Sequence, residues 1–303
     1  MKQPFKTGEL KAELERTLGF RMAEFTRLKC VNSVNFKAVR EGDGFAFTVK
    51  CLPPERRIGY QWIVRHLDEL RGTLAPQRVF ERECPSRFDA YDLICLAWCE
   101  GKGMFPDRLT EDQLIRFLDD YLDFSKALQR TTLHHAPYPS AKWRDEALAA
   151  SGVGWGRLVR PVIEMCAKDE SAFRPELSGI QHGDLHPGNF AFSNGRVSGF
   201  FDVEGLTEGY PAWDLVRYFA FALDHLRFYE RHRGSVILRR FAAAVRHLPY
   251  SREEWVVSLN VSWLEQVYKK MDRMRFGPLA ALQLRLHARL YRRLRKVVEE
   301  NLV

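Results

Sequence analysis

One stretch of the chain, residues 181–205, constrains the fold more than any other: QHGDLHPGNFAFSNGRVSGFFDVEG. Two apolar runs, 190–192 and 197–201, lie on either side of Asn194-Gly195. Asn-Gly favours the two-residue type I′ turn, because both of its positions need a positive φ. The stretch therefore predicts a β-hairpin with polar residues clustered at its open end.

The open end of this hairpin predicts a cation site. A hairpin returns the chain to its start, so Asn189 and Asp202 are expected to lie side by side. An amide oxygen and a carboxylate are hard ligands that suit Mg²⁺. Asp184 lies five residues before Asn189, across a loop with Pro187-Gly188, and can reach the same point without ligating the metal. General-base chemistry on a hydroxyl requires a carboxylate placed in this way.

Three motifs in this part of the chain carry a resemblance to a known family. Residues 182–189, HGDLHPGN, resemble the catalytic loop of the aminoglycoside phosphotransferase and choline kinase family, a branch of the protein-kinase-like fold with its H-x-D-x-x-x-x-N loop. Residues 201–204, FDVE, are similar to the metal-binding Asp segment of that family. Residues 211–215, PAWDL, resemble the start of the following helix, where Asp214 would brace the catalytic loop. The motifs match in order and spacing over 181–215.

The resemblance implies an α+β, bilobal protein-kinase-like fold with a small β-rich N-lobe and a large mostly helical C-lobe. It divides the chain into an N-terminal nucleotide-binding lobe, 1–98, and a C-terminal catalytic and acceptor-binding helical lobe, 99–303. The residue patterns agree with this division. Strand-favouring runs predict strands at 24–28, 36–40, 45–50, 77–81 and 91–98. Apolar periodicity predicts helices at 60–70, 110–129, 141–150, 155–168, 213–230, 235–247, 252–274 and 278–301.

The resemblance also implies roles for residues of the C-terminal motifs. Asp184 would orient and deprotonate an acceptor hydroxyl, and Asn189 and Asp202 would hold Mg²⁺. Glu204, two residues after Asp202, would assist the metal. The sequence thus indicates an ATP-dependent phosphotransferase that uses Mg²⁺, with GTP left open as the donor.

The N-terminal part resembles the family more loosely. Lys50, at the end of FAFTVK, resembles the strand lysine that pairs with the α- and β-phosphates. Trp98 and Cys99 lie where the family's hinge would offer backbone groups and an aromatic face to adenine, although core packing is an equal alternative for Trp98. The phosphate-covering loop would fall at 32–35, NSVN, which has no glycine to let backbone amides approach freely.

The acidic partner of the lysine is left open, with Glu69 or Gln61 as candidate positions. These departures motivate a second interpretation, a catalytically inactive kinase-like binding module that engages an anionic partner through basic C-terminal helices. A third interpretation is a metallohydrolase in which His182, Asp184 and His186 bind a transition metal. It ranks last, because Pro187-Gly188 ends any strand there and no further His-rich motif follows.

The spacing after the hairpin indicates a small acceptor rather than a peptide. Asp214 follows Asp202 by only twelve positions, which leaves no room for the activation segment of a protein kinase. Position 186 is His, where protein kinases usually present a Lys to the γ-phosphate. Both differences favour a small hydroxylated molecule.

The charge distribution bears on the acceptor's charge. The net charge is +8, and from residue 227 onward 17 Lys and Arg stand against 7 Asp and Glu. Six basic residues fall on the last predicted helix: Arg285, Arg289, Arg292, Arg293, Arg295 and Lys296. A field of this sign attracts anions, so we expect a neutral or anionic acceptor such as a sugar, phosphosugar, lipopolysaccharide or lipid headgroup. Nucleic acid is not the expected partner, whereas this helix could make peripheral membrane contact.

The remaining composition favours a cytoplasmic protein of undetermined oligomeric state. No run approaches the ~20 apolar residues of a membrane span, and the first 19 residues lack the apolar segment of a secretory signal. The cysteines, Cys30, Cys51, Cys84, Cys95, Cys99 and Cys166, contain no C-x-x-C pair. Cys95 and Cys99 could resemble a ligand pair, but buried free thiols in a reducing compartment are the favoured interpretation.

Overall fold

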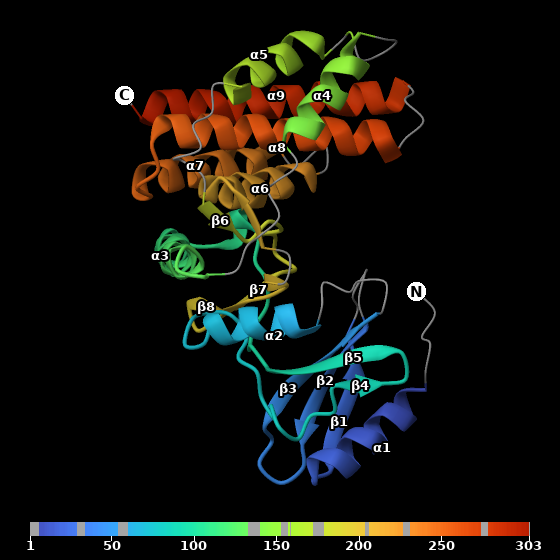
Figure 1. Cartoon of the computed structure of the whole chain (residues 1–303). Helices are drawn as coiled ribbons and strands as arrows, with labels where there is room; N and C mark the ends of the chain where they lie inside the picture. Colours follow the sequence, from blue (N-terminus) through green and yellow to red (C-terminus); the bar gives the residue numbers. More distant parts are fainter. Residues whose placement is uncertain are drawn as a thin grey trace. The chain divides into compact units, whose positions relative to one another are not determined.

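The chain divides into two compact units in the computed structural model (Figure 1). The first unit comprises Met1–Gly101 and Ser198–Glu204, and the second comprises Lys102–Val197 and Gly205–Val303. The structure describes residues 6–28, 34–53, 60–132, 140–152, 157, 159–171, 179–203, 206–226, 231–273 and 278–302. Ser198–Glu204 groups with the first unit, in which the Phe200 amide donates to the Leu74 carbonyl oxygen at 2.8 Å.

The first unit is built on a five-stranded antiparallel sheet, as predicted for the N-lobe. The strands follow the order β1 (Met22–Arg27), β2 (Val34–Arg40), β3 (Ala46–Leu52), β5 (Tyr91–Ala97) and β4 (Arg87–Phe88). Helix α1 (Thr7–Leu18) precedes the sheet, and α2 (Tyr60–Glu69) follows β3. A hairpin joins β2 to β3, the strands predicted at 36–40 and 45–50, and its glycines at positions 42 and 44 both have a positive φ.

The core of the first unit lies between α1 and the sheet. Leu10 and Leu14 are one helical turn apart and wholly buried in the same apolar cluster as Phe36, Phe47 and Val49. On β3 the side chains of Phe47 and Val49 share one face, because strand residues alternate between faces. Helix α1 therefore has a buried edge that packs on the sheet.

The strand predicted at 77–81 is not formed. Arg78 makes only an isolated bridge with Leu96, although Val79 donates to the Cys95 carbonyl oxygen at 3.0 Å. Phe80 has a φ of 55°, the left-handed region, which no strand accommodates. The segment follows β5 for about three residues and then turns away, since Phe80 closes the turn that ends at Cys84.

The second unit is mostly helical, as predicted for the C-lobe. Its helices are α3 (Glu111–Leu128), α4 (Ser140–Ser151), α5 (Arg160–Ser171), α6 (Pro211–Asp224), α7 (Arg231–His247), α8 (Arg252–Arg273) and α9 (Pro278–Asn301), with a 3₁₀ turn η2 (Pro106–Arg108). Thr110 caps α3 through a capping box with Gln113. Helix α6 ends at Asp224, short of the predicted 230, and α5 begins at Arg160 rather than 155. None of the helices that the structure describes has the length and apolar composition needed to cross a membrane.

Two pairs of short strands accompany these helices. Strand β6 (Gly179–Gln181) pairs with β9 (Thr207–Gly209), and the hairpin consists of β7 (Phe190–Ser193) and β8 (Arg196–Phe200). Asn194 and Gly195 both have a positive φ, which confirms the predicted turn.

Helix α9 is amphipathic and runs beside α8 (Figure 1). Its buried residues recur at helical spacing: Leu284, Ala288, Tyr291, Leu294 and Val298. Its exposed face carries the predicted basic residues: Arg285, Arg289, Arg292, Arg293 and Lys296. Arg295 differs, because its guanidinium donates to Asp169 at 2.5 Å and to Glu299 at 3.0 Å. Most of the basic residues of α9 thus lie on its solvent-exposed face, opposite the face whose apolar residues are buried.

Candidate active site

The predicted catalytic loop connects β6 to β7 in the second unit. The Asp214 carboxylate anchors its backbone. This carboxylate is completely buried and accepts from the backbone amides of His182 at 2.6 Å and Gly183 at 2.9 Å. The Tyr121 hydroxyl donates to it at 3.2 Å. Asp214 therefore braces the loop, as the sequence predicted. Burial raises the pKa of Asp214 above its usual value, while the nearby His182 ring and the hydrogen bonds act in the opposite direction.

The middle of the loop lies directly against the chain at Gly103. A Cβ added to Gly103 would lie 1.4 Å from the Pro187 carbonyl oxygen, which leaves room for glycine alone. Gly103 thus sets the position of the catalytic loop in the second unit.

Both histidines of the loop shape its backbone. His182 is fully buried, and its Nδ1 accepts from the Asp184 amide at 3.3 Å. His186 Nδ1 accepts from the Gly188 amide at 2.9 Å. The His186 ring also stacks on Phe221, with 5.1 Å between ring centroids. These contacts hold the loop backbone, and His186 Nε2 also lies 3.7 Å from Asp184 Oδ2. Among the described residues, no group of three or more His, Cys, Asp or Glu side chains is placed to hold a metal ion, so the metallohydrolase interpretation gains no support.

Asp184 projects from this loop with its carboxylate held from two sides. Arg217 donates to Oδ1 at 2.5 Å. The Asn189 amide nitrogen donates to the Asp184 carbonyl oxygen at 2.9 Å and to Oδ2 at 3.2 Å. The Asp184 side chain is 45% exposed, so solvent or a ligand can still reach it. A carboxylate fixed in orientation yet accessible is suited to accept a proton.

Asn189 is buried and makes a contact that bears on its predicted role. Because its amide nitrogen is committed to Asp184, its amide oxygen is the group able to ligate a cation. An amide oxygen is a hard ligand of the type that Mg²⁺ accepts.

Arg217 is the functional candidate that the sequence interpretation missed. Its guanidinium also donates to Glu265 on α8 at 3.0 Å and to the Gly183 carbonyl oxygen at 3.3 Å. The Glu265 side chain is 2% exposed and that of Arg217 is 18% exposed, so the carboxylate end of this pair is buried. Arg217 lies three residues after Asp214 on α6 and thus on the same helix face, which is the signal that could have found it.

In the first unit, Lys50 forms an ion pair with Asp202. Lys50 Nζ lies 2.7 Å from Asp202 Oδ1, and the lysine is buried while the carboxylate is half exposed. Asp202 has a φ of 56°, an uncommon conformation for a residue with a side chain. Such strained positions concentrate at functional sites, and here the strain accompanies the predicted metal ligand.

Most of the other candidate residues of the first unit are not described by the structure. Glu204, Asn32, Ser33 and the side chain of Gln61 lie outside the described residues. The Glu69 side chain is exposed, and the ion pair described for Lys50 is the one with Asp202.

At the predicted hinge, Lys37 Nζ lies 5.1 Å from the centroid of the half-buried Trp98 ring. A Cβ on Gly199 would lie 2.4 Å from Cys99 Sγ, so the Cys99 side chain packs on Gly199. A role of Cys99 toward adenine would therefore involve its backbone, and the nucleotide contacts of both residues stay predictions. The meeting of Asp184 and Asn189 with Asp202 around one cation also stays a prediction, because Asp202 belongs to the first unit and the other two to the second.

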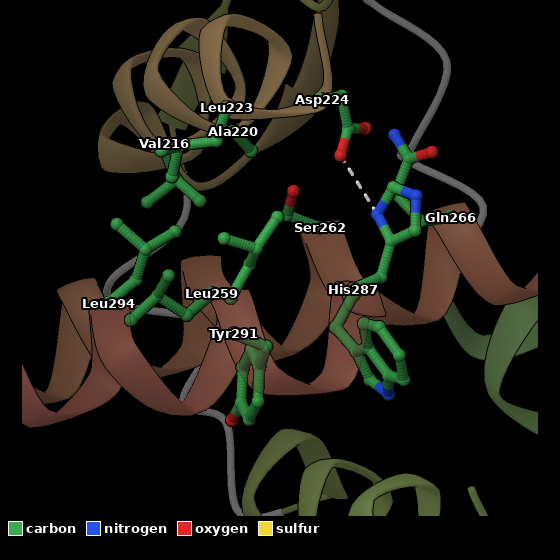
Figure 2. A pocket seen from close by; sticks show the side chains of 12 residues that line it. Val216, Ala220, Leu223, Asp224, Leu259, Ser262, Gln266, His287, Tyr291 and Leu294 are labelled. Carbon is green, nitrogen blue, oxygen red and sulfur yellow. Dashed lines mark ion pairs between the residues drawn. The ribbon is translucent and has the colours of Figure 1, made fainter. Parts of the chain in front are cut away.

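A small crevice opens between α6, α8 and α9 of the second unit (Figure 2). Its cavity measures about 30 Å³, space for roughly one water molecule. Its rim carries an ion pair between His287 Nδ1 and Asp224 Oδ1 at 2.9 Å. Its remaining lining is mainly apolar: Val216, Ala220, Leu223, Leu259, Ser262, Trp263, Gln266, Leu290, Tyr291 and Leu294.

Comparisons with known proteins bear on the family and the fold of the chain. The model of the phosphotransferase enzyme family matches residues 96–255, just over half of the chain. An aminoglycoside phosphotransferase from Alicyclobacillus acidocaldarius has 16% sequence identity and a TM-score of 0.62, over 99% of this chain and 98% of that chain. A choline/ethanolamine kinase family protein from Mesorhizobium loti has 14% identity and a TM-score of 0.59, over 97% and 99%.

Spectinomycin phosphotransferase, in complex with ADP and spectinomycin, has 14% identity and a TM-score of 0.60, over 98% of both chains. At these identities the likeness shows the fold, an α+β protein-kinase-like fold with a small sheet lobe and a large helical lobe. No sequence of a curated protein matches the chain.

Proposed function

Because the chain belongs to the phosphotransferase enzyme family, we propose that it transfers the γ-phosphoryl group of ATP to a hydroxyl of a small acceptor, with Mg²⁺ bound. The observation that carries the proposal is the set of contacts around Asp184. Its carboxylate is oriented by Arg217 and Asn189 but stays accessible. A phosphoryl-transfer enzyme needs such a group to orient the attacking hydroxyl.

The donors available for the metal fit Mg²⁺. Asn189 offers an amide oxygen, and Asp202 offers a carboxylate that is half exposed. Mg²⁺, when bound, would neutralise the negative charge that develops on the phosphate groups. In this proposal Asn189 and Asp202 hold the cation, while Glu204 assists them.

The chain's own residues would then perform three tasks. Asp184 hydrogen-bonds the acceptor hydroxyl and takes its proton as the oxygen attacks the γ-phosphorus. Arg217 keeps that carboxylate in place through its second contact with Glu265. The Lys50 ammonium, which pairs with Asp202 in this structure, contacts the α- and β-phosphates of the bound nucleotide and contributes a compact positive charge there. Positioning and charge stabilisation would supply most of the rate acceleration.

We further propose a neutral or anionic acceptor and a cytoplasmic location. Exposed basic residues on α9 give this face of the helix a field that attracts anions and repels polycations. A sugar, phosphosugar or lipid headgroup fits that field better than a polycationic aminoglycoside. The related spectinomycin phosphotransferase was crystallised with ADP, which supports a nucleotide as the donor.

Nucleotide binding at Lys50 of the first unit can be tested by thermal shift. We expect ATP to raise the melting temperature of the wild-type protein, and Mg²⁺ to increase that rise. Lys50→Met should reduce kcat/KM by about 10²-fold or more and diminish the ATP-dependent shift, because a charge that faces the phosphates is lost.

The control is Lys126→Met, which removes a solvent-exposed lysine that pairs with Asp123 on α3. It should behave as wild type. A wild-type protein without any Mg²⁺-dependent ATP shift would instead favour the inactive binding module.

Arg217→Gln tests the positioning of Asp184. Since the amide carries no charge and cannot span both carboxylates, we expect kcat to fall by about 10²-fold with little change in the KM for ATP. The variant should also have a lower melting temperature, because the buried Glu265 carboxylate loses its hydrogen bond from the Arg217 guanidinium.

The double variant Arg217→Gln/Glu265→Gln separates the two effects. It removes both charges, so its melting temperature should lie closer to that of wild type than the melting temperature of Arg217→Gln does. Its kcat should stay as low as that of Arg217→Gln. Recovery of kcat together with stability would mean that Arg217 serves folding alone.

A further inference from the structure

Two cysteine thiols of the first unit lie in direct contact. Cys84 Sγ is 3.1 Å from Cys95 Sγ, which is about 1 Å more than a disulfide bond of ~2.05 Å. Cys95 lies on β5 and is 2% exposed, whereas Cys84 lies in the turn before β4 and is half-buried. Neither residue belongs to the candidate active site.

The backbone around both thiols is already fixed in this arrangement. Before the turn, the Val79 amide donates to the Cys95 carbonyl oxygen at 3.0 Å. Within the turn, the Cys84 amide donates to the Phe80 carbonyl oxygen at 2.7 Å. After the turn, the Leu93 amide donates to the Ser86 carbonyl oxygen at 3.0 Å. The turn is thus held on both sides of Cys84, and the two sulfurs can approach without rearrangement of the sheet.

The two thiols differ in their readiness to ionise. A hydrogen bond from Cys95 lowers the pKa of Cys84, and the charge of Arg78 acts in the same direction against the effect of burial. The hydrogen bond to Cys84 and burial both raise the pKa of Cys95. Cys84 is also the more exposed of the two, so it combines the two properties of a reactive thiol.

The other described cysteines have a different environment. Burial raises the pKa of Cys51 to about 12, that of Cys166 to about 12 and that of Cys99 to about 11. Buried, protonated thiols react slowly with oxidants. Among the cysteines that the structure describes, oxidation should therefore be selective for Cys84.

We propose that Cys84 and Cys95 are a redox modification site that forms a reversible intramolecular disulfide when the folded protein meets a peroxide. The Cys84 thiolate attacks one peroxide oxygen, the O–O bond breaks, and Cys84 becomes a sulfenic acid with release of water. Cys95 then loses its proton, and its sulfur attacks Cys84 Sγ and displaces a second water. Two thiols and hydrogen peroxide thus give one disulfide and two waters, and an excess of a dithiol reverses the step by exchange.

The bond would join residues 11 apart and fasten the turn to β5. A short loop closed in this way stabilises the folded state mainly by restricting the unfolded chain, so the oxidised protein should melt at a higher temperature than the reduced one. The inference does not depend on the proposed phosphotransferase function.

The experiment treats the full chain with a small excess of hydrogen peroxide under native conditions, blocks free thiols and maps the peptides by mass spectrometry. We expect a peptide pair linked through Cys84 and Cys95, lighter by two hydrogen atoms than the free peptides and separated by dithiothreitol. Cys166→Ser is the matched control and should form the same link. Cys95→Ser should instead retain a sulfenic acid at Cys84 that dimedone traps.

Cys84→Ser should give neither the link nor the dimedone adduct, and circular dichroism reports whether each variant is folded. Cys84→Ala replaces it if the serine variant does not fold. The proposal is overturned if the folded wild-type protein keeps both thiols after peroxide treatment. It is equally overturned if the link joins another pair of cysteines, or if it forms faster in urea than in the folded state.

Discussion

Asp184→Asn is expected to lower kcat for phosphoryl transfer by about 10²–10⁴-fold, the usual contribution of a positioned general base. The asparagine oxygen can still accept from Arg217, but no carboxylate is left to take the proton of the acceptor hydroxyl. Its new amide group would also face the Asn189 amide nitrogen, which now donates to Asp184 Oδ2. We expect the affinity for the ATP complex of Mg²⁺ to stay within about twofold of wild type, since Asp184 is not one of the proposed metal ligands.

The measurement separates catalysis from binding. Consumption of ATP in the presence of hydroxyl compounds gives kcat, and calorimetric titration with a non-hydrolysable ATP analogue gives affinity. Asp123→Asn is the matched control, because Asp123 is a carboxylate of the same unit that is largely exposed and forms an ion pair with Lys126 at 3.6 Å. Unchanged turnover in Asp184→Asn, or an equal loss of turnover and binding, would contradict the role assigned to Asp184.

The local parts of the candidate site were readable in the sequence because short-range geometry encodes them. Asn194-Gly195 specifies its own turn, and the turn specifies the hairpin that follows Asn189. The bracing role of Asp214 likewise follows from a motif with fixed spacing, and the hydrogen bonds to His182 and Gly183 bear it out. In each case the residues that interact belong to one recognisable pattern.

Contacts between distant elements could not be predicted in this way. Glu265 lies on α8, and nothing in its local sequence indicates that it meets Arg217 on α6. The pairing of Cys84 with Cys95 also depends on a turn with a left-handed Phe80. That residue misled the strand prediction for 77–81, because a run of strand-favouring residues reports side-chain preference and not the backbone conformation imposed by packing.

The short strands of the second unit show a further limit. Strands β6 and β9 contain three residues each, too few for alternation of apolar and polar residues to be recognised. They nevertheless place Gln181, the residue before the catalytic loop, opposite Thr207. Their pairing depends on the packing of the surrounding helices and is therefore a property of the tertiary structure.

Asp214→Ala should have the largest effect on stability, a loss of about 3–5 kcal/mol in the free energy of unfolding. The carboxylate is fully buried and accepts from two backbone amides and from Tyr121. Alanine removes the acceptor of all three and leaves a cavity beneath the catalytic loop. Urea unfolding gives the value, and Tyr121→Phe is the graded control. It removes one of these donors, together with the bond from the Tyr121 hydroxyl to the Pro211 carbonyl oxygen at 2.8 Å, and should cost only about 0.5–1.5 kcal/mol.

The pH dependence of this stability difference has a defined sign. Because burial raises the pKa of Asp214, the folded state binds its proton more tightly than the unfolded state does. The contribution of Asp214 to stability is therefore greatest below the usual carboxyl pKa, and it decreases as the pH rises through the raised pKa. The alanine variant lacks this titration, so the difference in free energy of unfolding between wild type and Asp214→Ala should shrink from pH 4 toward neutral pH. A difference that grows over the same range would show that the hydrogen bonds to the ionised carboxylate outweigh its burial.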